Sequence, residues 1–465
     1  MKDNTEENKM EKIISLCKRR GFIFPGSELY GGLAGTWDYG PFGVALKKNI
    51  ENLWWKKFVD GREDMFGLES AILMNSKIWE ASGHVAGFTD PLVECKNCKS
   101  RFRADQVLES LGKTGVAGAT IEQMSAKFKS GQDIVCPSCG KRDWTDVRQY
   151  NMMFKTQIGA VEETSDTIYL RPENAQAMFV NYKNVMDSIH PKLPFGIAQI
   201  GRAFRNEITP RDFTFRTREF NLMEFEYFVR ESDWEKYFDY WREEILEWMD
   251  LVGIDKELVH ELEVLPEDRA HYSKRTIDFE FDFPFGRKEL YGLAYRTNFD
   301  LTKHQEESGV TLEYLDEETR EKFIPHAIEP SFGLDRTILA LLVSAYREDV
   351  APGATDIRTY LKFDPKVAPV ICAVSPLLKN KPELVEKARE VFGILKTEFG
   401  RVMWDDNGNI GKRYRRQDEI GTPWCIVIDF DTLEDDTVTV RERDSGHQER
   451  LPASSLVSYI KDRLS

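Results

Sequence analysis

The segment at residues 196–230 constrains this chain most, because it combines two predicted strands with an unusual number of ionic side chains. Two runs rich in aromatic and β-branched residues flank a turn at residues 209–212, which predicts an antiparallel hairpin with a long loop. A purely structural hairpin rarely carries so many ions, because a buried and unpaired charge is costly. The segment therefore predicts a ligand that holds several negative charges.

Length and charge narrow the class of protein. A chain of 465 residues has room for a large core, and its length favours roughly three domains. No long apolar run is present, so no membrane span is expected, and the polar N-terminus without a signal region favours a cytoplasmic location. The net charge of −15 argues against bulk non-specific binding of nucleic acid. A polyanionic partner would have to meet local basic patches.

Four of the seven cysteines form two CxxC pairs, Cys95 with Cys98 and Cys136 with Cys139. Each pair lies among residues typical of tight turns, and four thiolates suit one tetrahedral zinc ion. The two pairs are further apart than in a usual zinc ribbon, so free thiols or a site that has lost its metal remain the alternative. We expect a structural zinc, because four protein ligands leave no open position for catalysis.

A second signal lies at residues 325–343. A predicted strand, a turn at Gly333 and a buried apolar helix follow one another there, with Arg336 in the first turn of the helix. Residues 68–74 are also predicted to form a strand. His84, in the run ASGH, is a candidate catalytic base. A lone histidine beside glycine is, however, more often a hydrogen-bonding structural residue.

The pattern changes after residue 350. The chain then alternates between β and α elements, with a strand at 367–374 and a helix at 382–399 that Gly400 ends, which predicts a compact α/β module. We therefore divide the chain into five parts: the beginning of one domain (1–90), a Cys-rich insertion (91–145), the core of that domain with helical and acidic insertions (146–350), a linker (351–364) and a C-terminal domain (365–465).

These motifs closely resemble the homodimeric bacterial type of glycyl-tRNA synthetase, a class II aminoacyl-tRNA synthetase, over nearly the whole length. The hairpin, with FRNE before its turn and FRTREF after it, matches the second class II motif, and GLDR with its apolar helix matches the third. The runs ASGH, RPEN and EPSFG resemble the glycine enzyme specifically. The resemblance implies an α+β catalytic domain with an antiparallel sheet flanked by helices, a small zinc-type insertion and an α/β anticodon-binding domain.

The resemblance also implies an ATP site. Amino-acid activation joins a carboxylate to the α-phosphorus and expels pyrophosphate, so catalysis consists of aligning two anions and neutralising charge. Arginine suits this task because its guanidinium donates bidentately and stays protonated. Arg205 would bind the α-phosphate, Arg216 and Arg336 the terminal phosphates, Phe220 would stack on adenine and Glu207 would accept from its amino group. The full implied set is Arg205, Asn206, Glu207, Phe215, Arg216, Thr217, Arg218, Glu219, Phe220, Glu289, Leu290, Gly333, Leu334, Asp335 and Arg336, with Glu289 as a Mg²⁺ ligand.

Glycine has no side chain, so an enzyme must recognise its ammonium group and exclude anything bulkier. Glu173, Glu224 and Glu329, with Ser331, would surround the ammonium with acceptors and leave no room for a Cβ. Because the rejection is steric, no second hydrolytic site is needed. The glycine-binding residues implied by the resemblance are Arg103, Glu173, Phe220, Asn221, Leu222, Met223, Glu224, Glu329, Pro330, Ser331, Phe332 and Gly333.

The C-terminal module resembles the anticodon-binding domain of a subgroup of class II enzymes, which implies tRNA(Gly) as partner. Its densest basic run is at residues 411–416, and Arg441 and Arg443 add charge, which favours phosphate contact and base stacking over a merely solvated face. A homodimer is implied by the family alone, because the first class II motif normally contains a proline and residues 68–74 have none.

Two other functions remain to be separated from glycine activation. One is a synthetase of the same class for serine, threonine or proline. The other is a catalytically inactive relative that serves as a binding subunit, as the accessory subunit of a mitochondrial polymerase resembles this fold. Internal salt bridges would be the structural explanation of the arginines.

Overall fold

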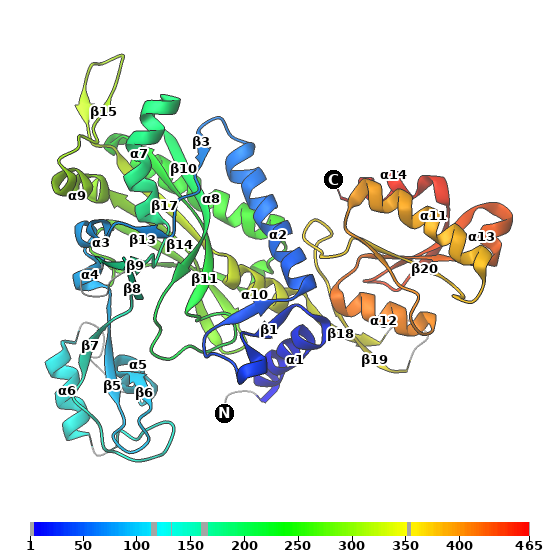
Figure 1. The fold of residues 1–465 in the computed structure, drawn as a ribbon, viewed down its shortest axis with the longest axis horizontal. Coiled ribbons are helices and arrows are strands. Elements are labelled where there is room, and N and C mark those ends of the chain that lie inside the picture. The colour runs from blue at the N-terminus through cyan, green and yellow to red at the C-terminus, as the bar shows by residue number, and fades with distance from the viewer. Residues whose placement is uncertain (1–3, 113–118, 132, 160–165, 351–354, 465) are drawn as a thin grey trace.

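The computed structural model describes residues 4–112, 119–131, 133–159, 166–350 and 355–464. A large body built on a sheet carries two appendages, a cysteine-rich lobe and a C-terminal domain (Figure 1). Residues 113–118 and 132 of the expected insertion, 160–165 of the expected core and 351–354 of the expected linker lie outside the described residues. Within the described chain, no helix has both the length and the apolar character required to cross a bilayer.

The body contains a seven-stranded sheet of order β12-β13-β14-β17-β11-β10-β3. Its neighbouring strands are antiparallel except β10 and β3, which are parallel. The expected antiparallel sheet flanked by helices is therefore confirmed. The strands are β3 (Met65–Gly67), β10 (Phe195–Phe204), β11 (Glu219–Val229), β12 (Val259–Glu263), β13 (Arg275–Phe283), β14 (Gly286–Thr297) and β17 (His326–Gly333).

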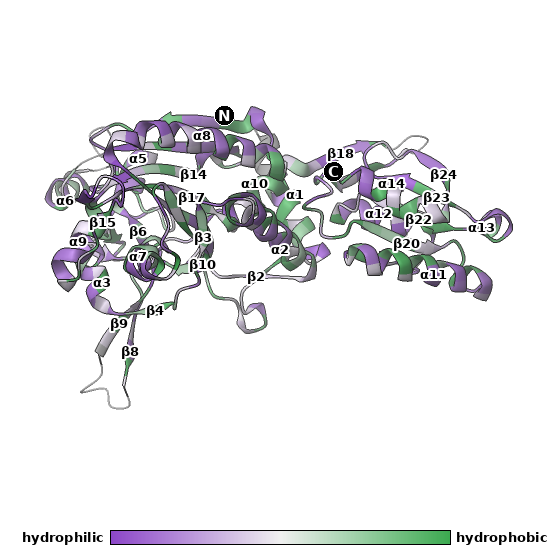
Figure 2. Ribbon diagram, turned by 90° about the horizontal axis from the view of Figure 1, so that it is seen from above, coloured by the Kyte–Doolittle hydropathy of each residue, from purple (hydrophilic) through white to green (hydrophobic). Residues whose placement is uncertain are grey.

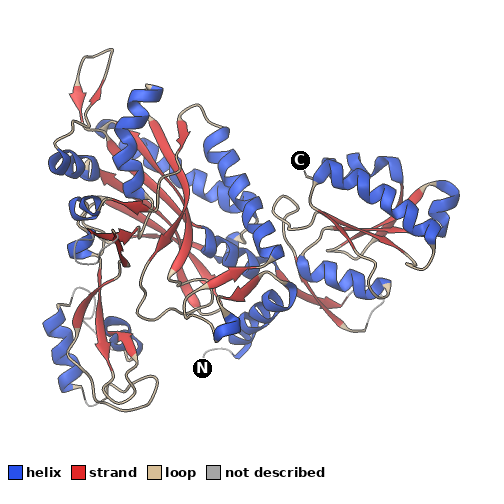
Figure 3. Cartoon of the chain, viewed as in Figure 1, coloured by secondary structure: helices blue, strands red, loops and turns tan. Residues whose placement is uncertain are grey.

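Helices cover both faces of this sheet (Figure 3). One face packs in the main core against α2 (Pro41–Trp55), α8 (Trp234–Val252) and α10 (Leu334–Ala345). The opposite face meets α7 (Ala175–Ile189) and α9 (Phe299–Ser308). Since successive side chains of a strand point to opposite faces, Phe225 of β11 packs in the main core, whereas Glu224 and Glu226 point to the other side.

The predicted hairpin is present as β10 and β11, which pair from Phe195 with Phe228 to Phe204 with Glu219. The Arg205 amide donates to the Arg218 carbonyl at 2.9 Å and prolongs the pairing beyond the strands. The connecting loop turns through Asp212 and Phe213, whose positive φ angles of 61° and 57° place both in the left-handed region. Phe213 and Phe215 of this loop pack in the main core, so the loop belongs to the body.

Smaller elements surround the sheet. The cysteine-rich lobe contains β5 (Thr89–Glu94), β6 (Arg101–Arg103), β7 (Arg148–Asn151), α5 (Ala104–Ser110) and α6 (Ile121–Ser130). Strands β8 (Lys155–Ile158) and β9 (Asp166–Leu170) pair with each other and project from the body (Figure 2). The remaining elements are α1 (Asn4–Arg20), β1 (Ile23–Pro25), β2 (Trp37–Tyr39), β4 (Leu73–Met74), α3 (Ser76–Ala81), α4 (His84–Gly87), β15 (Tyr314–Leu315) and β16 (Lys322–Phe323).

The C-terminal domain has a five-stranded sheet of order β21-β20-β22-β23-β24 and its own apolar core. Strand β20 is parallel to β21 and β22, and the last three strands are antiparallel. The expected α/β module is confirmed, as is the helix that ends at Gly400 (φ +66°). Its elements are β20 (Cys372–Pro376), α11 (Pro382–Phe399), β21 (Val402–Trp404), α12 (Ile410–Ile420), β22 (Trp424–Ile428), α13 (Phe430–Asp435), β23 (Thr437–Glu442), β24 (Gln448–Pro452) and α14 (Leu456–Asp462).

Two predicted strands are wrong in extent, since the one at residues 367–374 begins only at Cys372, as β20, and the one at residues 68–74 is mostly absent. Of the strand predicted at residues 68–74, only Leu73 and Met74 are in a strand, β4, because β3 ends at Gly67 and the chain bends in between. The segment predicted as a linker contains the strand β19 (Ile357–Leu361), which pairs with β18 (Tyr346–Val350). Leu361 and Phe363 pack in the main core, so this segment is anchored to the large body.

Candidate active site

A pocket opens on the β11 and β17 face of the sheet, with about 750 Å³ of empty space including the solvent at its mouth. The sequence-predicted residues that line it are Arg205, Glu207, Phe215, Arg216, Thr217, Phe220, Asn221, Leu222, Glu224, Glu289, Leu290, Ser331, Gly333, Asp335 and Arg336. The two motifs predicted from sequence therefore meet in one cavity.

The three arginines reach the pocket from different elements and have only weak internal partners. The guanidinium of Arg205 lies between the rings of Phe88 and Phe220, at 5.3 and 5.2 Å from their centroids, and its Nε donates to the Pro172 carbonyl at 3.1 Å. Arg216 is 3.7 Å from Oε2 of Glu207. A loose ion pair of this kind leaves most of the guanidinium donors available to a ligand.

Arg336, in the first turn of α10, closes the pocket from the side of β14. Its Nη1 donates to the Glu289 carbonyl at 3.0 Å and lies 3.3 Å from the Glu289 carboxylate. The guanidinium also lies 4.4 Å from the centroid of the Phe215 ring. Because Glu289 is half-exposed, this ion pair contributes little to stability. Internal salt bridges thus account poorly for the pocket arginines.

Two buried oxygens of the pocket lack a hydrogen-bond partner within the described chain. They are Oε2 of Glu207 and Oγ1 of Thr214. Buried polar atoms in native proteins are nearly always paired, and exceptions often mark a place where a ligand or water binds. Thr214 was missed by the sequence analysis, although it lies inside the predicted loop.

Four carboxylates interact with one another at this place, and of these only Glu224 lines the pocket. Oε1 of Glu224 accepts from Ser331 at 2.6 Å, and Oε2 accepts from the Asn174 amide at 3.2 Å. Burial, and then the neighbouring Glu329, raise the pKa of Glu224 to about 7. Burial also raises the pKa of Glu329, although Arg296 binds it at 2.8 Å. Glu226 lies deeper still, and among the described residues neither carboxylate oxygen has a hydrogen-bond partner.

The fourth carboxylate, Glu173, behaves in the opposite way. Burial works to raise its pKa, but His84 at 3.2 Å and Arg296 outweigh burial and lower it far below the ordinary range. Arg296 is itself buried and binds Asp300 through two nitrogens at 2.8 and 2.9 Å. The sequence analysis missed Arg296, because an arginine in the middle of a predicted strand gives no signal of its own.

The second and third motifs are joined through Asp335. One oxygen of this buried carboxylate accepts from the Asn221 amide at 2.6 Å, and the other accepts a short hydrogen bond from the Tyr39 hydroxyl. Tyr39 belongs to β2, so three segments distant in sequence meet at one carboxylate. Asp335 therefore fixes β11 relative to the start of α10.

Several predicted residues lie beside the pocket or point away from it. Met223 and Phe332 are fully buried in the main core, because they alternate with pocket-facing neighbours on β11 and β17. Glu219 pairs with Arg202 at 2.6 Å, and Arg218 donates to the Ala34 and Glu207 carbonyls. The others outside the pocket lining are Asn206, Leu334, Pro330, Glu329, Glu173 and Arg103.

Arg103 reaches toward the site from the cysteine-rich lobe. It pairs with Asp90 at 3.0 Å and Asp105 at 2.6 Å, and it interacts electrostatically with Glu207. In addition, the Thr209 hydroxyl of the hairpin loop is 3.4 Å from the Arg101 carbonyl of the lobe. The lobe is thus connected to the hairpin loop by both contacts.

The four cysteines of the lobe converge, with all four sulfur atoms within 4.8 Å of one another. Cys95 and Cys139 are 3.6 Å apart, as are Cys98 and Cys136. Both CxxC turns have the same backbone bonds, from the Lys99 amide to the Cys95 carbonyl and from the Gly140 amide to the Cys136 carbonyl. A zinc tetrahedron with bonds of about 2.3 Å has sulfur–sulfur edges of about 3.8 Å, so the cluster fits that ion.

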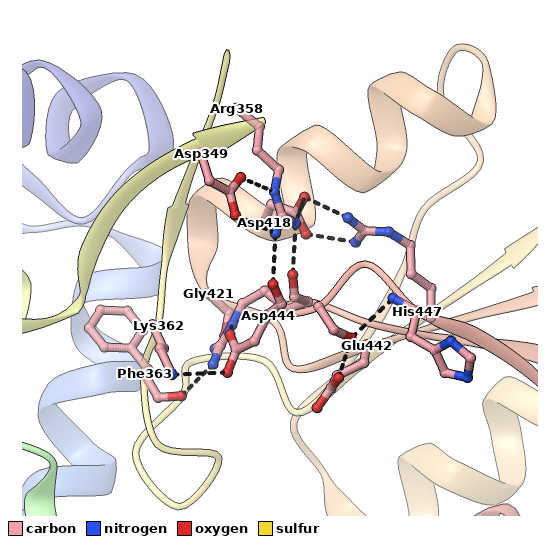
Figure 4. A network of polar contacts seen from close by, with 12 residues as sticks. Asp349, Arg358, Lys362, Phe363, Asp418, Gly421, Glu442, Asp444 and His447 are labelled. Carbon is pink, nitrogen blue, oxygen red and sulfur yellow. Dashed lines mark hydrogen bonds and ion pairs between the residues drawn. The ribbon is translucent and has the colours of Figure 1, made fainter. Parts of the chain in front are cut away.

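Three of the basic residues in the C-terminal domain bind within the protein. Arg413, Arg441 and Arg443 are buried. Arg441 binds both oxygens of Asp418 at 2.8 and 3.0 Å. Arg443 donates to the carbonyls of Gly421 and Phe363. Figure 4 shows this network, in which Arg358 of β19 also binds Asp418.

Two arginines of this network join the C-terminal domain to the body, Arg443 through the Phe363 carbonyl and Arg358 through Asp418. Arg358 binds Asp349 at 2.6 and 3.0 Å and donates to the carbonyls of Arg443 and Asp444. Beside this network, Glu419 of α12 pairs with Arg19 and Arg20 of α1. Within the basic run, Lys412 and Arg415 are the exposed cations.

Comparisons with known proteins agree with this geometry. Residues 154–345 match the family described as tRNA synthetase class II core domain (G, H, P, S and T), and residues 371–463 match the anticodon binding domain. A glycine–tRNA ligase of Alkaliphilus oremlandii is 51% identical over 463 residues, which cover 98% of this chain and 99% of the relative. Those of Clostridium acetobutylicum and Geobacillus thermodenitrificans are 50% identical over 464 and 461 residues, covering 99% and 98% of this chain and 99% and 98% of the relatives. The chain therefore belongs to the glycine–tRNA ligases, a family of class II aminoacyl-tRNA synthetases.

Proposed function

We propose that the arginine-lined pocket is where this glycine–tRNA ligase activates glycine with ATP before transferring it to the 3′ end of tRNA(Gly). A carboxylate oxygen of glycine attacks the α-phosphorus, a new oxygen–phosphorus bond forms, and the bond to pyrophosphate breaks. No protein nucleophile takes part. The observation that carries the proposal is the meeting of Arg205, Arg216 and Arg336 with Glu224 in one cavity.

The arginines supply the charge that this reaction needs. Negative charge accumulates on the pentacoordinate phosphorus, and fixed cations stabilise it without reorganising at the moment of reaction. We assign Arg205 to the α-phosphate and Arg216 and Arg336 to the terminal phosphates. Phe220 is assigned to adenine stacking and Glu207 to the adenine amino group. The supporting observation is that Oε2 of Glu207 is buried and has no hydrogen-bond partner among the described residues. The other ATP-site residues predicted from sequence remain part of this proposal.

Glycine selection is assigned to the carboxylates Glu173, Glu224 and Glu329 and to Ser331. Arg296 and Ser331 hold two of these carboxylates in place with short hydrogen bonds. A carboxylate that is already oriented loses little entropy when it binds the substrate ammonium. Larger amino acids are rejected because a Cβ would have to displace these fixed groups.

Mg²⁺ is proposed at Glu289, whose carboxylate would hold the ion, and the ion would offset negative charge on the phosphates. The neighbouring Asp278 on β13, which the sequence analysis missed, supports an oxygen-rich cation site. Burial, followed by Glu289 and Glu280, raises the pKa of Asp278 to about 7, so the local excess of negative charge favours a cation. Zinc is proposed at the four-cysteine cluster, where it would hold the lobe together.

We infer the remaining assignments from the family. They are a homodimer, a cytoplasmic location and tRNA(Gly) contact by the C-terminal domain, with the division of the chain into parts 1–90, 91–145, 146–350, 351–364 and 365–465. The packing changes a few residues after the last boundary, since Val370 packs in the main core and Ile371 packs in the separate C-terminal core.

ATP–pyrophosphate exchange across a panel of amino acids tests the activity. Glycine should stimulate exchange, whereas serine, threonine, proline and alanine should not. Stimulation by serine, threonine or proline instead of glycine would favour a synthetase of different specificity. No exchange with any amino acid would favour a catalytically inactive binding subunit.

A further inference from the structure

His84 lies between a serine and a carboxylate of the proposed glycine site. Its Nδ1 is 2.8 Å from the Ser82 hydroxyl, and its Nε2 is 3.2 Å from Oε2 of Glu173. Ser82 is buried, and the side chains of His84 and Glu173 are only 10% and 14% exposed. Gly83, at φ +81°, forms the left-handed turn between the serine and the histidine. The side chains of Ser82, His84 and Glu173 thus form a continuous series of polar contacts.

Because an ionised carboxylate only accepts hydrogen bonds, Glu173 favours the proton of a neutral His84 on Nε2, and the Ser82 hydroxyl can then donate to Nδ1. A neutral imidazole has one N–H, and a hydroxyl can donate to the other nitrogen. When Ser82 donates to Nδ1 of His84, the proton is on Nε2, which then donates to Glu173. In the charged imidazolium both nitrogens donate, so Nε2–H faces the carboxylate in either state.

The ring of His84 is held by packing as well as by hydrogen bonds. The Trp79 ring meets it edge-on at 5.5 Å between centroids, and Phe88 lies at the same distance on a tilted plane. Phe88 also contacts the guanidinium of Arg205. The ring therefore has little freedom to turn away from Glu173, and its position is tied to the phosphate side of the pocket.

Glu173 has a second fixed donor, because Nε2 of Gln176 donates to its other oxygen, Oε1, at 3.2 Å. Both carboxylate oxygens thus have a partner from the protein. Glu224 differs, since burial raises its pKa to about 7, with Glu329 and then Glu173 adding to the effect. Glu173 is kept charged, and its negative charge helps to keep a proton on Glu224.

We propose that His84, oriented by Ser82, is a positioning residue that holds the Glu173 carboxylate in place for the ammonium group of the glycine substrate. The inference rests on the proposed function, because it takes Glu173 as part of the glycine site. His84 touches neither substrate in this proposal. It acts through Glu173, so its loss should affect glycine use and leave ATP use nearly unchanged.

Two substitutions of His84 separate positioning from packing. His84→Phe keeps an aromatic ring against Trp79 and Phe88 but removes both nitrogens. His84→Gln places an amide donor near the position of Nε2. Because hydrogen bonds to charged groups contribute more than neutral ones, we expect His84→Phe to raise the glycine KM by about 10- to 100-fold. The ATP KM should stay within about twofold, and His84→Gln should recover most of the loss.

His260→Phe is the matched control. His260 also pairs with a carboxylate, at 2.7 Å from Asp282, but it lies on β12 at the edge of the sheet, outside the pocket lining. Its substitution should leave both KM values unchanged. Ser82→Ala should raise the glycine KM less than His84→Phe does, because the imidazole then selects its tautomer without help. If His84→Phe does not fold, Ser82→Ala compared with wild type tests the same contacts from Ser82 through His84 to Glu173.

The inference is overturned if His84→Phe leaves the glycine KM at the wild-type value, if it raises both KM values equally, or if His84→Gln is no better than His84→Phe. An unchanged glycine KM in Ser82→Ala would also overturn the inference. Glu173→Ala distinguishes this failure from that of the proposed site. If Glu173→Ala raises the glycine KM while the His84 variants do not, only the positioning role of His84 is wrong. If Glu173→Ala has no effect, or wild type shows no glycine-dependent exchange, the glycine site fails and the inference fails with it.

Discussion

The Ser331 hydroxyl donates to Oε1 of Glu224 at 2.6 Å, and the two residues are direct partners in the pairing of β17 with β11. The sheet itself therefore sets this contact, without help from a loop. A donor fixed by backbone pairing holds the carboxylate in one orientation, which is the pre-organisation that recognition of a small ammonium group requires.

Glu224→Gln should raise the glycine KM or lower kcat by about tenfold or more, because the amide keeps the shape but removes the charge that faces the ammonium. The ATP KM should change little, since the proposed function assigns Glu224 to glycine and not to ATP. Pyrophosphate exchange at varied glycine and then varied ATP measures both. Unchanged glycine kinetics would remove Glu224 from the glycine site.

Glycine activation should depend on pH near neutrality, because burial and Glu329 raise the pKa of Glu224 from 4.5 to about 7. Below pH 7 the carboxyl is protonated and loses attraction for the ammonium, so kcat/KM for glycine should rise with pH and level off above 7. The folded protein binds the proton of Glu224 more tightly than the unfolded chain does. This proton therefore adds to the free energy of unfolding below about pH 4.5, and its contribution is lost as the pH rises through 7.

The matched variant for this profile is Glu224→Gln, which cannot ionise. Its kcat/KM for glycine should lack the inflection near pH 7 that wild type shows, while any inflection shared by both proteins belongs to other groups. An identical pH profile in the two proteins would contradict the assignment of the titration to Glu224.

Asp335→Ala should destabilise the protein, because it leaves the buried Asn221 amide and Tyr39 hydroxyl without their acceptor. Loss of a buried charged acceptor costs about 2–4 kcal/mol. Denaturant unfolding measures the change, and the KM for ATP should rise as β11 and α10 lose their common anchor. Asp356→Ala is a suitable control, since Asp356 is an exposed aspartate. Equal stability of the two variants would show that Asp335 does not fix this junction.

Purified protein should contain about one zinc per chain, and removal of the metal should loosen the cysteine-rich lobe. Because Arg103 and the Arg101 carbonyl connect that lobe to the hairpin loop, the loop should become more susceptible to proteolysis after metal removal. Elemental analysis and limited proteolysis measure the two effects, and Cys98→Ser should behave like the metal-free protein. A metal-free preparation with wild-type protease resistance would exclude a structural metal.

The sequence predicts those parts of the fold in which neighbours along the chain decide the structure. The hairpin, the helix that begins beside Arg336 and the helix ended by Gly400 are of this kind. Strand alternation would also have separated Met223 and Phe332, which face the core, from Glu224 and Ser331. The strand at residues 68–74 fails because apolar composition alone does not provide a pairing partner.

Contacts between distant segments could not be predicted in this way. The partners His84 with Glu173, Tyr39 with Asp335 and Arg358 with Asp418 come from separate elements that meet only after folding. The C-terminal arginines are the clearest case. A basic residue that will bind a buried aspartate looks the same in sequence as one that will bind phosphate, and only burial distinguishes them.

That distinction leads to a prediction for tRNA binding. Lys412 and Arg415 are exposed on α12, whereas Arg441 is buried against Asp418. Lys412→Glu with Arg415→Glu should raise the KM for tRNA(Gly) about tenfold or more at low salt, because repulsion replaces attraction to phosphate. Pyrophosphate exchange and the unfolding midpoint should remain at wild-type values, since neither side chain is part of the pocket.

Arg441→Ala should instead lower stability by about 3–5 kcal/mol, because it leaves Asp418 buried with one partner fewer. Aminoacylation kinetics at several salt concentrations, together with denaturant unfolding, separate the two effects. An unchanged tRNA KM in the double variant would place the tRNA contact of this domain on another surface.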